Sequence, residues 1–261
     1  MDEFLAVENP LLPQILMEER DFLVVYKAPR MHSVPLVHSP REQAPRELVS
    51  YETILEWCVL KFPEIADLSG RRPGEGGLIH RLDYETQGLM LFARTHSGME
   101  ALLQEQKEGR IEKEYSALTE ESEIVLPGFP ELPPGFFSDG AGLIKSAFRP
   151  YGPGRKAVRP VISGARRKGT LEEQYFTEIV EERPLGQGIK AFRIRIRKGF
   201  RHQIRNHLAW IGRPILNDAL YGGTSYGRGF LGLRASSLTF TDPSSGRERT
   251  FSISPFGLDE V

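Results

Sequence analysis

Cysteine is nearly absent from the sequence: Cys58 is the one cysteine in 261 residues, so the chain cannot form an internal disulfide. This composition is typical of proteins from reducing compartments, and we expect a cytoplasmic location. No apolar run approaches the roughly 20 residues that cross a bilayer, so no membrane partner is expected. Asp2, Glu3 and Glu8 near the start do not follow the basic and then apolar order of a signal peptide.

Metal-binding and nucleotide-binding motifs are also missing. The chain has six histidines, and no pair has the four-residue spacing of a helical zinc site; His202 and His207 are five apart. There is no Walker-type loop, no strand-linked dinucleotide fingerprint and no Gly-x-Ser-x-Gly elbow. We therefore expect no metal, no nucleotide and no other cofactor.

The net charge of −1 conceals an uneven distribution of charge. Residues 141–214 contain 17 Lys and Arg, 5 Glu and no Asp, whereas residues 1–70 contain 6 basic and 12 acidic residues. A basic half in a neutral protein can be a phosphate-binding surface. It can equally be a solvated surface balanced by an acidic neighbour, and charge alone favours neither interpretation.

Hydrophobic patterning predicts a mixture of strands and helices. Helical spacing of apolar residues indicates a helix from Leu48 to Val59, and capping-box spacing at Ser97 and Glu100 opens a second helix, which Gly109 ends. A third helix is expected over residues 202–212. Strands are expected at residues 21–28, 89–93, 111–119, 173–181, 191–198, 231–242 and 250–254.

This order favours an α+β fold with a mixed, largely antiparallel central sheet flanked by helices. No sharp change in composition marks a detachable part, so one domain is expected over residues 1–261. Residues 120–170 are rich in proline, glycine and basic residues, and predict an irregular insert with short strands and turns.

A carboxylate on a turn between two strands is the feature around which the chain is organised. Asp83 follows His80 and Arg81, and precedes the apolar strand at residues 89–93. Loops held by rigid strands commonly carry catalytic groups, although most aspartates beside turns only bond the local backbone. With no metal or nucleotide motif, the residues favour covalent or base chemistry by a carboxylate.

The clearest alternating pattern lies at residues 191–198. Phe192, Ile194 and Ile196 face one side of the predicted strand, and Arg193, Arg195 and Arg197 face the other. A solvated polar face is favoured over direct RNA contact, because a sheet with one buried side needs a polar side.

Three segments in order resemble the RluA-type family of RNA pseudouridine synthases. His80 to Ala93 is similar to that family's catalytic motif, and Lys113-Glu-Tyr115 is similar to its Lys-x-Tyr strand. Residues 199–208, followed by residues 212–222, are similar to its third motif and the turn after it. The resemblance spans roughly residues 15–255, and implies the pseudouridine synthase catalytic fold without an N-terminal S4-like RNA-binding domain.

The resemblance implies an isomerase that converts uridine in structured rRNA or tRNA to its C-glycoside isomer, with no cofactor. Asp83 would attack or deprotonate the ribose, and Arg205 would pair with Asp83 and keep it ionised. Tyr115 would stack on the flipped uracil and handle a proton, and Arg81 would fill the space that the base leaves. The other residues expected to contact the substrate are His80, His202, Ile204 and Leu208.

The chain departs from the family pattern beside the expected catalytic residues. Related synthases often carry Ser where Gln87 stands and a basic residue where Tyr84 stands. They usually have Arg-Thr before His202, where this chain has Phe200 and Arg201. These departures bear on substrate choice, since they flank the catalytic positions rather than replace them.

Two other functions remain to be compared with isomerisation. A non-catalytic RNA-binding or RNA-folding protein could keep the same scaffold, although the joint presence of Asp83, Tyr115 and Arg205 argues against it. A hydrolase of sugar N-glycosides needs a second carboxylate to activate water, for which Glu85 is the nearby candidate in sequence. We expect a monomer that binds RNA through loops or unstacked segments.

Overall fold

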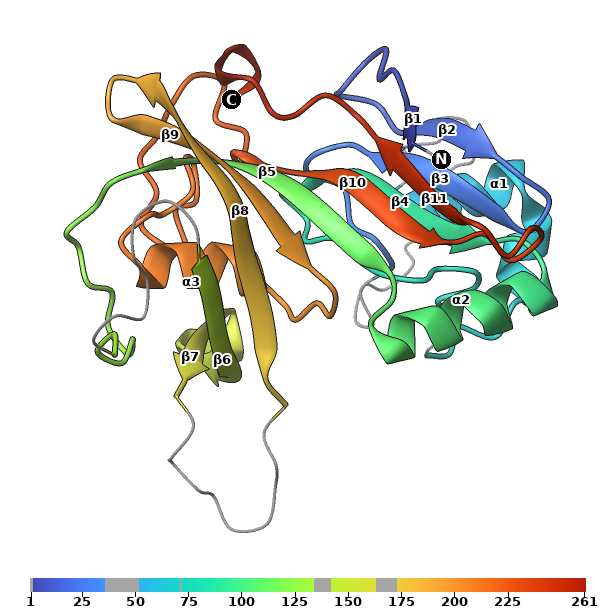
Figure 1. Ribbon diagram of the computed structural model, residues 1–261, viewed down its shortest axis with the longest axis horizontal. Coiled ribbons are helices and arrows are strands. Elements are labelled where there is room, and N and C mark those ends of the chain that lie inside the picture. The colour runs from blue at the N-terminus through green and yellow to red at the C-terminus, as the bar shows by residue number, and fades with distance from the viewer. Residues whose placement is uncertain (1, 36–51, 71, 134–141, 163–172) are drawn as a thin grey trace, which may run out of the picture. The chain divides into compact units, whose positions relative to one another are not determined.

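The computed structural model describes residues 2–35, 52–70, 72–133, 142–162 and 173–261. Its contacts divide the chain into two compact units (Figure 1). The first unit comprises Met1–Ile111 and Ser237–Ser254, and the second comprises Glu112–Ser236 and Pro255–Val261. Three α-helices accompany the strands in the described residues, which confirms the α+β expectation. The expected single domain over residues 1–261 stays a prediction.

The first unit contains a sheet ordered β2-β3-β4-β10, with β11 beside β10 and β1 beside β11. Its strands are β1 (Asp2–Phe4), β2 (Gln14–Glu18), β3 (Phe22–Lys27), β4 (Gln87–Ala93), the end of β10 (Leu233–Thr241) and β11 (Glu248–Ser252). β3 and β4 pair antiparallel from Phe22↔Ala93 to Lys27↔Gly88, and both are buried along their whole length. The pairs β2–β3 and β10–β11 are also antiparallel, and the pair β1–β11 is parallel. The strands predicted at residues 21–28 and 89–93 are therefore confirmed, whereas the strand expected directly before the Asp83 turn is wrong, because the segment there forms only an isolated bridge between Leu78 and Phe92.

Two helices accompany this sheet, and one begins where the sequence did not place it. α2 (His96–Glu108) is capped by Thr95, whose Oγ1 accepts a hydrogen bond from the Gly98 N–H at 3.0 Å. The predicted capping box at Ser97 and Glu100 is thus wrong, because Thr95 satisfies the free N–H groups of the first turn two residues earlier. Gly109 ends the helix with φ 72°, as predicted.

The other helix of this unit is α1 (Ile54–Lys61), with Thr53 as its cap and the buried Trp57 in its middle. A 3-10 turn, η1 (Pro63–Asp67), follows it. Leu48, with which the predicted helix began, and most of the loop predicted before it lie outside the described residues.

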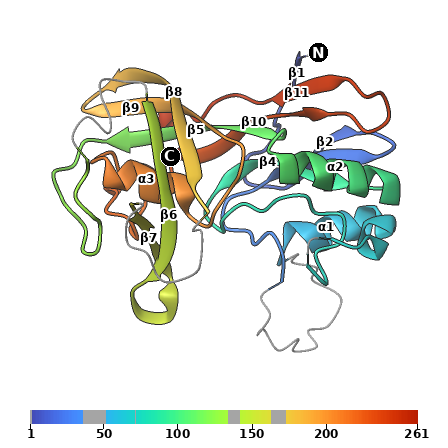
Figure 2. The same cartoon turned by 60° about the horizontal axis from the view of Figure 1, so that its bottom comes forward.

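The second unit contains five antiparallel strands in the order β5-β9-β8-β6-β7 (Figure 2). They are β5 (Glu112–Glu120), β6 (Gly142–Tyr151), β7 (Ala157–Val161), β8 (Tyr175–Gly186) and β9 (Ile189–Ile196). α3 (Gln203–Trp210) packs against β7 and β8, and its last residue, Trp210, donates a hydrogen bond to the Pro130 carbonyl at 2.8 Å. Two 3-10 turns, η2 (Pro153–Arg155) and η3 (Leu258–Glu260), complete the unit.

The expected insert at residues 120–170 contains regular structure as well as loop. β6 and β7 lie inside it and form a hairpin, in agreement with the short strands predicted there. The segment between β5 and residue 133 has no helix or strand, and its carbonyls accept hydrogen bonds from Arg149, Arg159 and Trp210. These side chains therefore hold the loop in addition to its few backbone hydrogen bonds, such as that from the Phe129 N–H to the Leu126 carbonyl.

The alternating pattern of β9 is confirmed, and its arginines are neutralised. Phe192, Ile194 and Ile196 are buried. On the other face, the three arginines of residues 193–197 form salt bridges with glutamates of β5 and β8, namely Arg193 with Glu114 and Glu181, Arg195 with Glu112, Glu114 and Glu178, and Arg197 with Glu112. We call these six cross-strand contacts the β9 ladder. Because glutamates neutralise the arginines of the β9 ladder, this face is better explained as a solvated polar face than as an RNA contact.

None of the helices in the described ranges is both long and apolar enough to cross a membrane.

Candidate functional site

Asp83 lies in the first unit, on a turn that is held at both ends. Before it, Leu82 exchanges two hydrogen bonds with one hydroxyl: the Leu82 N–H donates to Ser33 Oγ at 3.0 Å, and Ser33 Oγ donates to the Leu82 carbonyl at 2.8 Å. After it, the Thr86 N–H donates to the Asp83 carbonyl at 3.1 Å, and β4 begins at Gln87. The carboxylate is half-buried, so a rigid frame presents it while it stays accessible.

A buried cation lies beside this turn, at the end of β3. Lys27 is 0% exposed, and its Nζ donates to the carbonyls of Ala28 at 2.9 Å, Met31 at 2.8 Å and Tyr84 at 3.3 Å. Burial lowers the pKa of Lys27 to about 7, and the carboxylates of Asp83 and Glu85 act in the opposite direction. Lys27 thus links the segment after β3 to the Asp83 turn and places a titrating charge near Asp83.

Lys27 should make folding stability depend on pH. Its pKa is lowered on folding, so between about pH 7 and 10.5 the unfolded chain binds a proton that the folded chain has released. The free energy of unfolding should therefore rise with pH across that window, by up to about 1.4 kcal/mol per pH unit. Urea denaturation at several pH values should show this rise in the natural chain and not in Lys27→Met. Parallel pH profiles for the two proteins would contradict the assignment.

The residues around Asp83 differ in exposure. His80 is buried, whereas the Arg81 side chain is 49% exposed and lies 3.5 Å from Glu75 Oε1 through its Nη1. Tyr84 is 42% exposed, and its ring centre lies 4.6 Å from that of His32. Arg81 is thus exposed and contacts one carboxylate, and its expected place in the space left by the base stays a prediction.

Arg205 lies in the second unit and has a different environment from the one predicted. Arg201 and Arg205 are four residues apart, a helical spacing that predicts a shared polar face, but Arg205 is 7% exposed. It forms a two-pronged ion pair with the buried Asp218, with Nε to Oδ2 at 2.7 Å and Nη2 to Oδ1 at 2.8 Å. The prediction is wrong because this carboxylate compensates a charge that burial would otherwise penalise. Arg201 is exposed, as expected.

Tyr115, His202, Ile204 and Leu208 also belong to the second unit. Tyr115 is 6% exposed and pairs with Ile194 across β5 and β9. Ile204 and Leu208 are buried, as an apolar stripe on α3 requires. His202 caps α3 with φ 56°, and its Nδ1 lies 3.1 Å from the Tyr221 hydroxyl. Asp83 belongs to the first unit, so its pairing with Arg205 and Tyr115 stays a prediction.

Tyr221 links several of these side chains. Its hydroxyl accepts a hydrogen bond from the Val158 N–H at 3.0 Å, and its ring lies 5.4 Å from the Arg205 guanidinium carbon. Burial raises the pKa of Tyr221, against the opposing effect of the Val158 hydrogen bond. Tyr221 therefore remains a neutral phenol that fixes the orientation of Arg205 and His202.

Comparison with known proteins assigns the chain to a family. The model of the family described as RNA pseudouridylate synthase matches residues 21–210. The chain belongs to the RNA pseudouridylate synthase family. This confirms the resemblance to RluA-type synthases found in the motifs.

Curated relatives of this RNA pseudouridylate synthase chain are longer than it is. Ribosomal large subunit pseudouridine synthase D of Blochmanniella floridana is 28% identical over 210 residues, which cover 80% of this chain and 54% of the relative. The protein of the same name from Vibrio parahaemolyticus is 27% identical over 254 residues, covering 92% of this chain and 66% of the relative. The chain thus spans between about half and two thirds of their length.

Two solved human structures share the fold. RNA Pseudouridylate Synthase Domain Containing 1 has a TM-score of 0.57 and 21% identity, over 93% of this chain and 84% of that one. RNA Pseudouridylate Synthase Domain Containing 4 has a TM-score of 0.56 and 17% identity, over 92% and 88%. The expected pseudouridine synthase fold is therefore confirmed.

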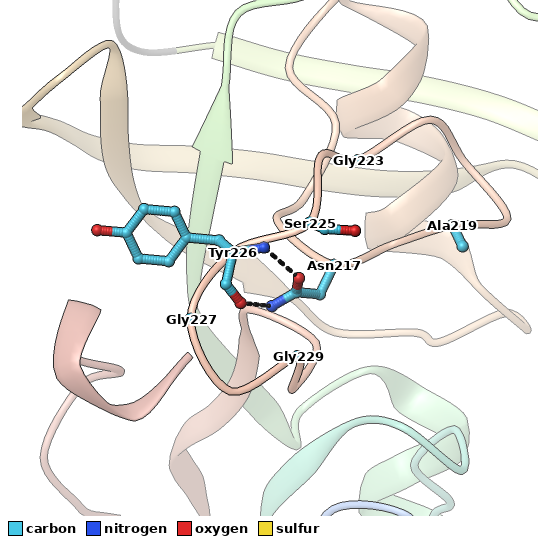
Figure 3. Close-up of a pocket in the computed structure, with 7 residues that line it drawn as sticks. All are labelled: Asn217, Ala219, Gly223, Ser225, Tyr226, Gly227 and Gly229. Carbon is cyan, nitrogen blue, oxygen red and sulfur yellow. Dashed lines mark hydrogen bonds between the residues drawn. The ribbon is translucent and has the colours of Figure 1, made fainter.

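A pocket of about 320 Å³ lies in the second unit of this pseudouridylate synthase chain, beyond the range that the family model matches. Its lining residues are Asn217, Ala219, Gly223, Ser225, Tyr226, Gly227 and Gly229 (Figure 3). Asn217 holds the loop closed, since its Oδ1 accepts from the Tyr226 N–H at 2.7 Å and its Nδ2 donates to the Tyr226 carbonyl at 3.0 Å. A Cβ at Gly223 would lie 1.9 Å from the Ile215 carbonyl, so the turn requires glycine there. None of the site residues predicted from sequence lines this pocket.

Sequence reasoning assigned no role to Lys27, Asp218, Tyr221 or His207. Lys27 ends an otherwise apolar strand, and Asp218 and Tyr221 lie in the turn after the third motif, so weak signals existed for these three. His207 gave no such signal in the sequence. In the structure its Nε2 lies 2.9 Å from Ser146 Oγ and its Nδ1 lies 2.8 Å from Thr177 Oγ1. Burial lowers the pKa of His207 to about 3, so this histidine is neutral and positions α3.

In the described portions of the chain, no group of three or more His, Cys, Asp or Glu side chains is arranged to hold a metal ion.

Proposed function

We propose that this chain is an RNA pseudouridine synthase that acts on rRNA, with Asp83 as its catalytic carboxylate. The observation that carries the proposal is the position of Asp83. It occupies the matching position of the family's catalytic motif, on a turn held by Ser33, by the Thr86 N–H and by the buried Lys27. Such a frame orients a reactive group before the substrate arrives.

In the proposed reaction the bond from ribose C1′ to uracil N1 breaks and a bond from C1′ to uracil C5 forms. Asp83 attacks or deprotonates the ribose while the first bond breaks. The hydrogen on C5 is finally lost to solvent and uracil N1 takes up a proton, so the product is an isomer of the substrate. Tyr115 stacks on the flipped uracil and takes part in this last proton transfer. Arg205 pairs with Asp83 in the substrate complex, and Arg81 leaves Glu75 to occupy the space vacated by the base.

The remaining motif residues are proposed to shape the pocket for the base. Ile204 and Leu208 supply apolar walls from α3, and His80 and His202 contact the substrate at the ends of their motifs. The names of the curated relatives support large-subunit rRNA as the substrate class.

The proposal predicts release of the C5 hydrogen from rRNA. Large-subunit rRNA transcribed with tritium at uridine C5 should lose tritium to water when incubated with the protein, and chromatography of the digested nucleosides should show pseudouridine. Pseudouridine maps of total RNA from cells with and without the protein should then differ at the modified uridine. Stable RNA binding without tritium release would instead support a non-catalytic RNA-binding protein.

A further inference from the structure

Most cations of β9 are neutralised, but those around the β6–β7 hairpin are not. Arg149, Arg155, Lys156 and Arg201 are all exposed. Among the described residues, none of these four forms a salt bridge with a carboxylate, whereas each arginine of the β9 ladder contacts at least one glutamate. Unlike the β9 ladder, the hairpin therefore presents cations that no carboxylate of the described residues neutralises.

Hydrogen bonds fasten these cations into one surface. β6 and β7 pair from Ala147↔Val161 to Tyr151↔Ala157, and the turn between them presents Arg155 and Lys156. Arg201, just before α3, donates through Nη2 to the Arg155 carbonyl at 2.7 Å and the Ala157 carbonyl at 3.2 Å. The hairpin turn and the approach to α3 thus form a continuous, fixed surface.

Aromatic rings lie next to these cations. Phe200 directly precedes Arg201, and its ring stacks on Phe148 with a centre distance of 4.9 Å and an interplanar angle of 5°. The Tyr175 ring lies 5.1 Å from that of Phe200. All three side chains are only half-buried, so ring surface remains in contact with solvent beside the positive charges.

We propose that the surface formed by Phe148, Arg149, Arg155, Lys156, Phe200 and Arg201, here called the hairpin surface, binds an unstacked single-stranded segment of an RNA. The cations contact phosphates and a base stacks on the Phe200 ring. The inference rests on the proposed function in that it takes RNA as the partner. The inference goes beyond the proposed function by placing part of the RNA on a surface outside the Asp83 turn and outside the residues proposed to line the pocket for the base.

Single-stranded RNA fits this surface better than a duplex or an acidic protein does. Aromatic side chains reach a base only when the base has left its helical stack, and stacking of this kind tolerates any base. An acidic peptide would use the cations and leave the rings without a role. Phe200 is also one of the departures from the family pattern, so stacking at this position would be a property of this chain.

Charge-matched variants test the contribution of the cations. Binding of a fluorescently labelled oligouridine of about twelve nucleotides is followed by anisotropy at several salt concentrations. Arg155→Gln with Lys156→Gln should weaken binding about tenfold, and should reduce the slope of log affinity against log salt by about 1.4, because each phosphate contact on single strands contributes about 0.7. The control, Arg193→Gln with Arg197→Gln, changes the net charge equally and should bind as the natural chain does. Equal losses in both double variants, or no loss in the first, would overturn the proposal.

Substitution of Phe200 tests the contribution of stacking. Phe200→Leu should weaken binding of the same oligouridine about tenfold without changing the salt slope, and Phe200→Tyr should restore it, because only the ring is needed. Circular dichroism of both variants checks that they fold. A blunt-ended RNA duplex or polyglutamate that competes with the oligouridine as well as unlabelled oligouridine does would overturn the assignment to single-stranded RNA.

The tritium-release assay separates this inference from the proposed function. If the natural chain releases no tritium but oligouridine binding still depends on Arg155, Lys156 and Phe200, the proposed function fails and the hairpin surface stands. If tritium is released normally and all hairpin variants bind as the natural chain does, the hairpin surface alone is wrong.

Discussion

Asp83→Asn should abolish pseudouridine formation while leaving the fold intact. The amide has the shape of the carboxylate but is neither a nucleophile nor a base, so tritium release should fall by at least about 10³-fold. The backbone of the turn, held by Ser33 and by the Thr86 N–H, does not depend on the Asp83 side chain. The thermal transition should therefore stay close to that of the natural chain, and RNA binding should persist.

Glu85→Gln is the matched control for this variant. Glu85 lies two residues further along the same turn, and its carboxylate also raises the pKa of Lys27. Both variants remove one negative charge beside Lys27, so any effect that acts through Lys27 is common to them. Glu85→Gln should retain most of the tritium-release activity. Retained activity would also exclude the hydrolase interpretation, in which the Glu85 carboxylate activates water. Equal loss in the two variants would show that charge near Lys27, rather than a reactive carboxylate at Asp83, is what matters.

Asp218→Asn should destabilise the second unit by about 3–5 kcal/mol. The substitution leaves the Arg205 guanidinium buried without its counter-charge, and uncompensated buried charges carry a cost of that size. Urea denaturation should detect the loss as a lower midpoint with little change in slope. An unchanged midpoint would mean that Arg205 escapes to solvent when Asp218 is neutral.

The double variant Arg205→Met with Asp218→Asn separates stability from catalysis. The double variant removes the buried charge together with its partner. Its loss of unfolding free energy should therefore be smaller than the sum of the two single losses, by a coupling of about 2–3 kcal/mol. Tritium release should stay low in the double variant even though part of the stability returns, because Arg205, the proposed partner of Asp83, is missing. Recovery of activity together with stability would assign Arg205 a purely structural role.

Local patterns predicted the elements whose cause is local. The buried strands β3 and β4 follow from unbroken apolar runs, and the two faces of β9 follow from strict alternation of Ile or Phe with Arg. Gly109 ended a helix as its left-handed backbone requires. These features depend on the period of a strand or on one residue's backbone, which the sequence shows directly.

Features that depend on distant partners could not be predicted in the same way. The burial of Arg205 requires Asp218, which lies 13 residues later, and the burial of Lys27 requires three carbonyls from two separate segments. The cap at Thr95 competed with an equally good pattern at Ser97. For Asp83, Tyr115 and Arg205 the resemblance supplied roles that no spacing along the chain could supply.

The positions of the two tryptophans give each unit its own optical reporter. Trp57 is buried in α1 of the first unit, and Trp210 is buried at the end of α3 in the second. A Trp210→Phe chain would emit from the first unit alone, and a Trp57→Phe chain from the second alone. Stopped-flow fluorescence of the two could then establish whether the units unfold at the same rate or as separate kinetic events.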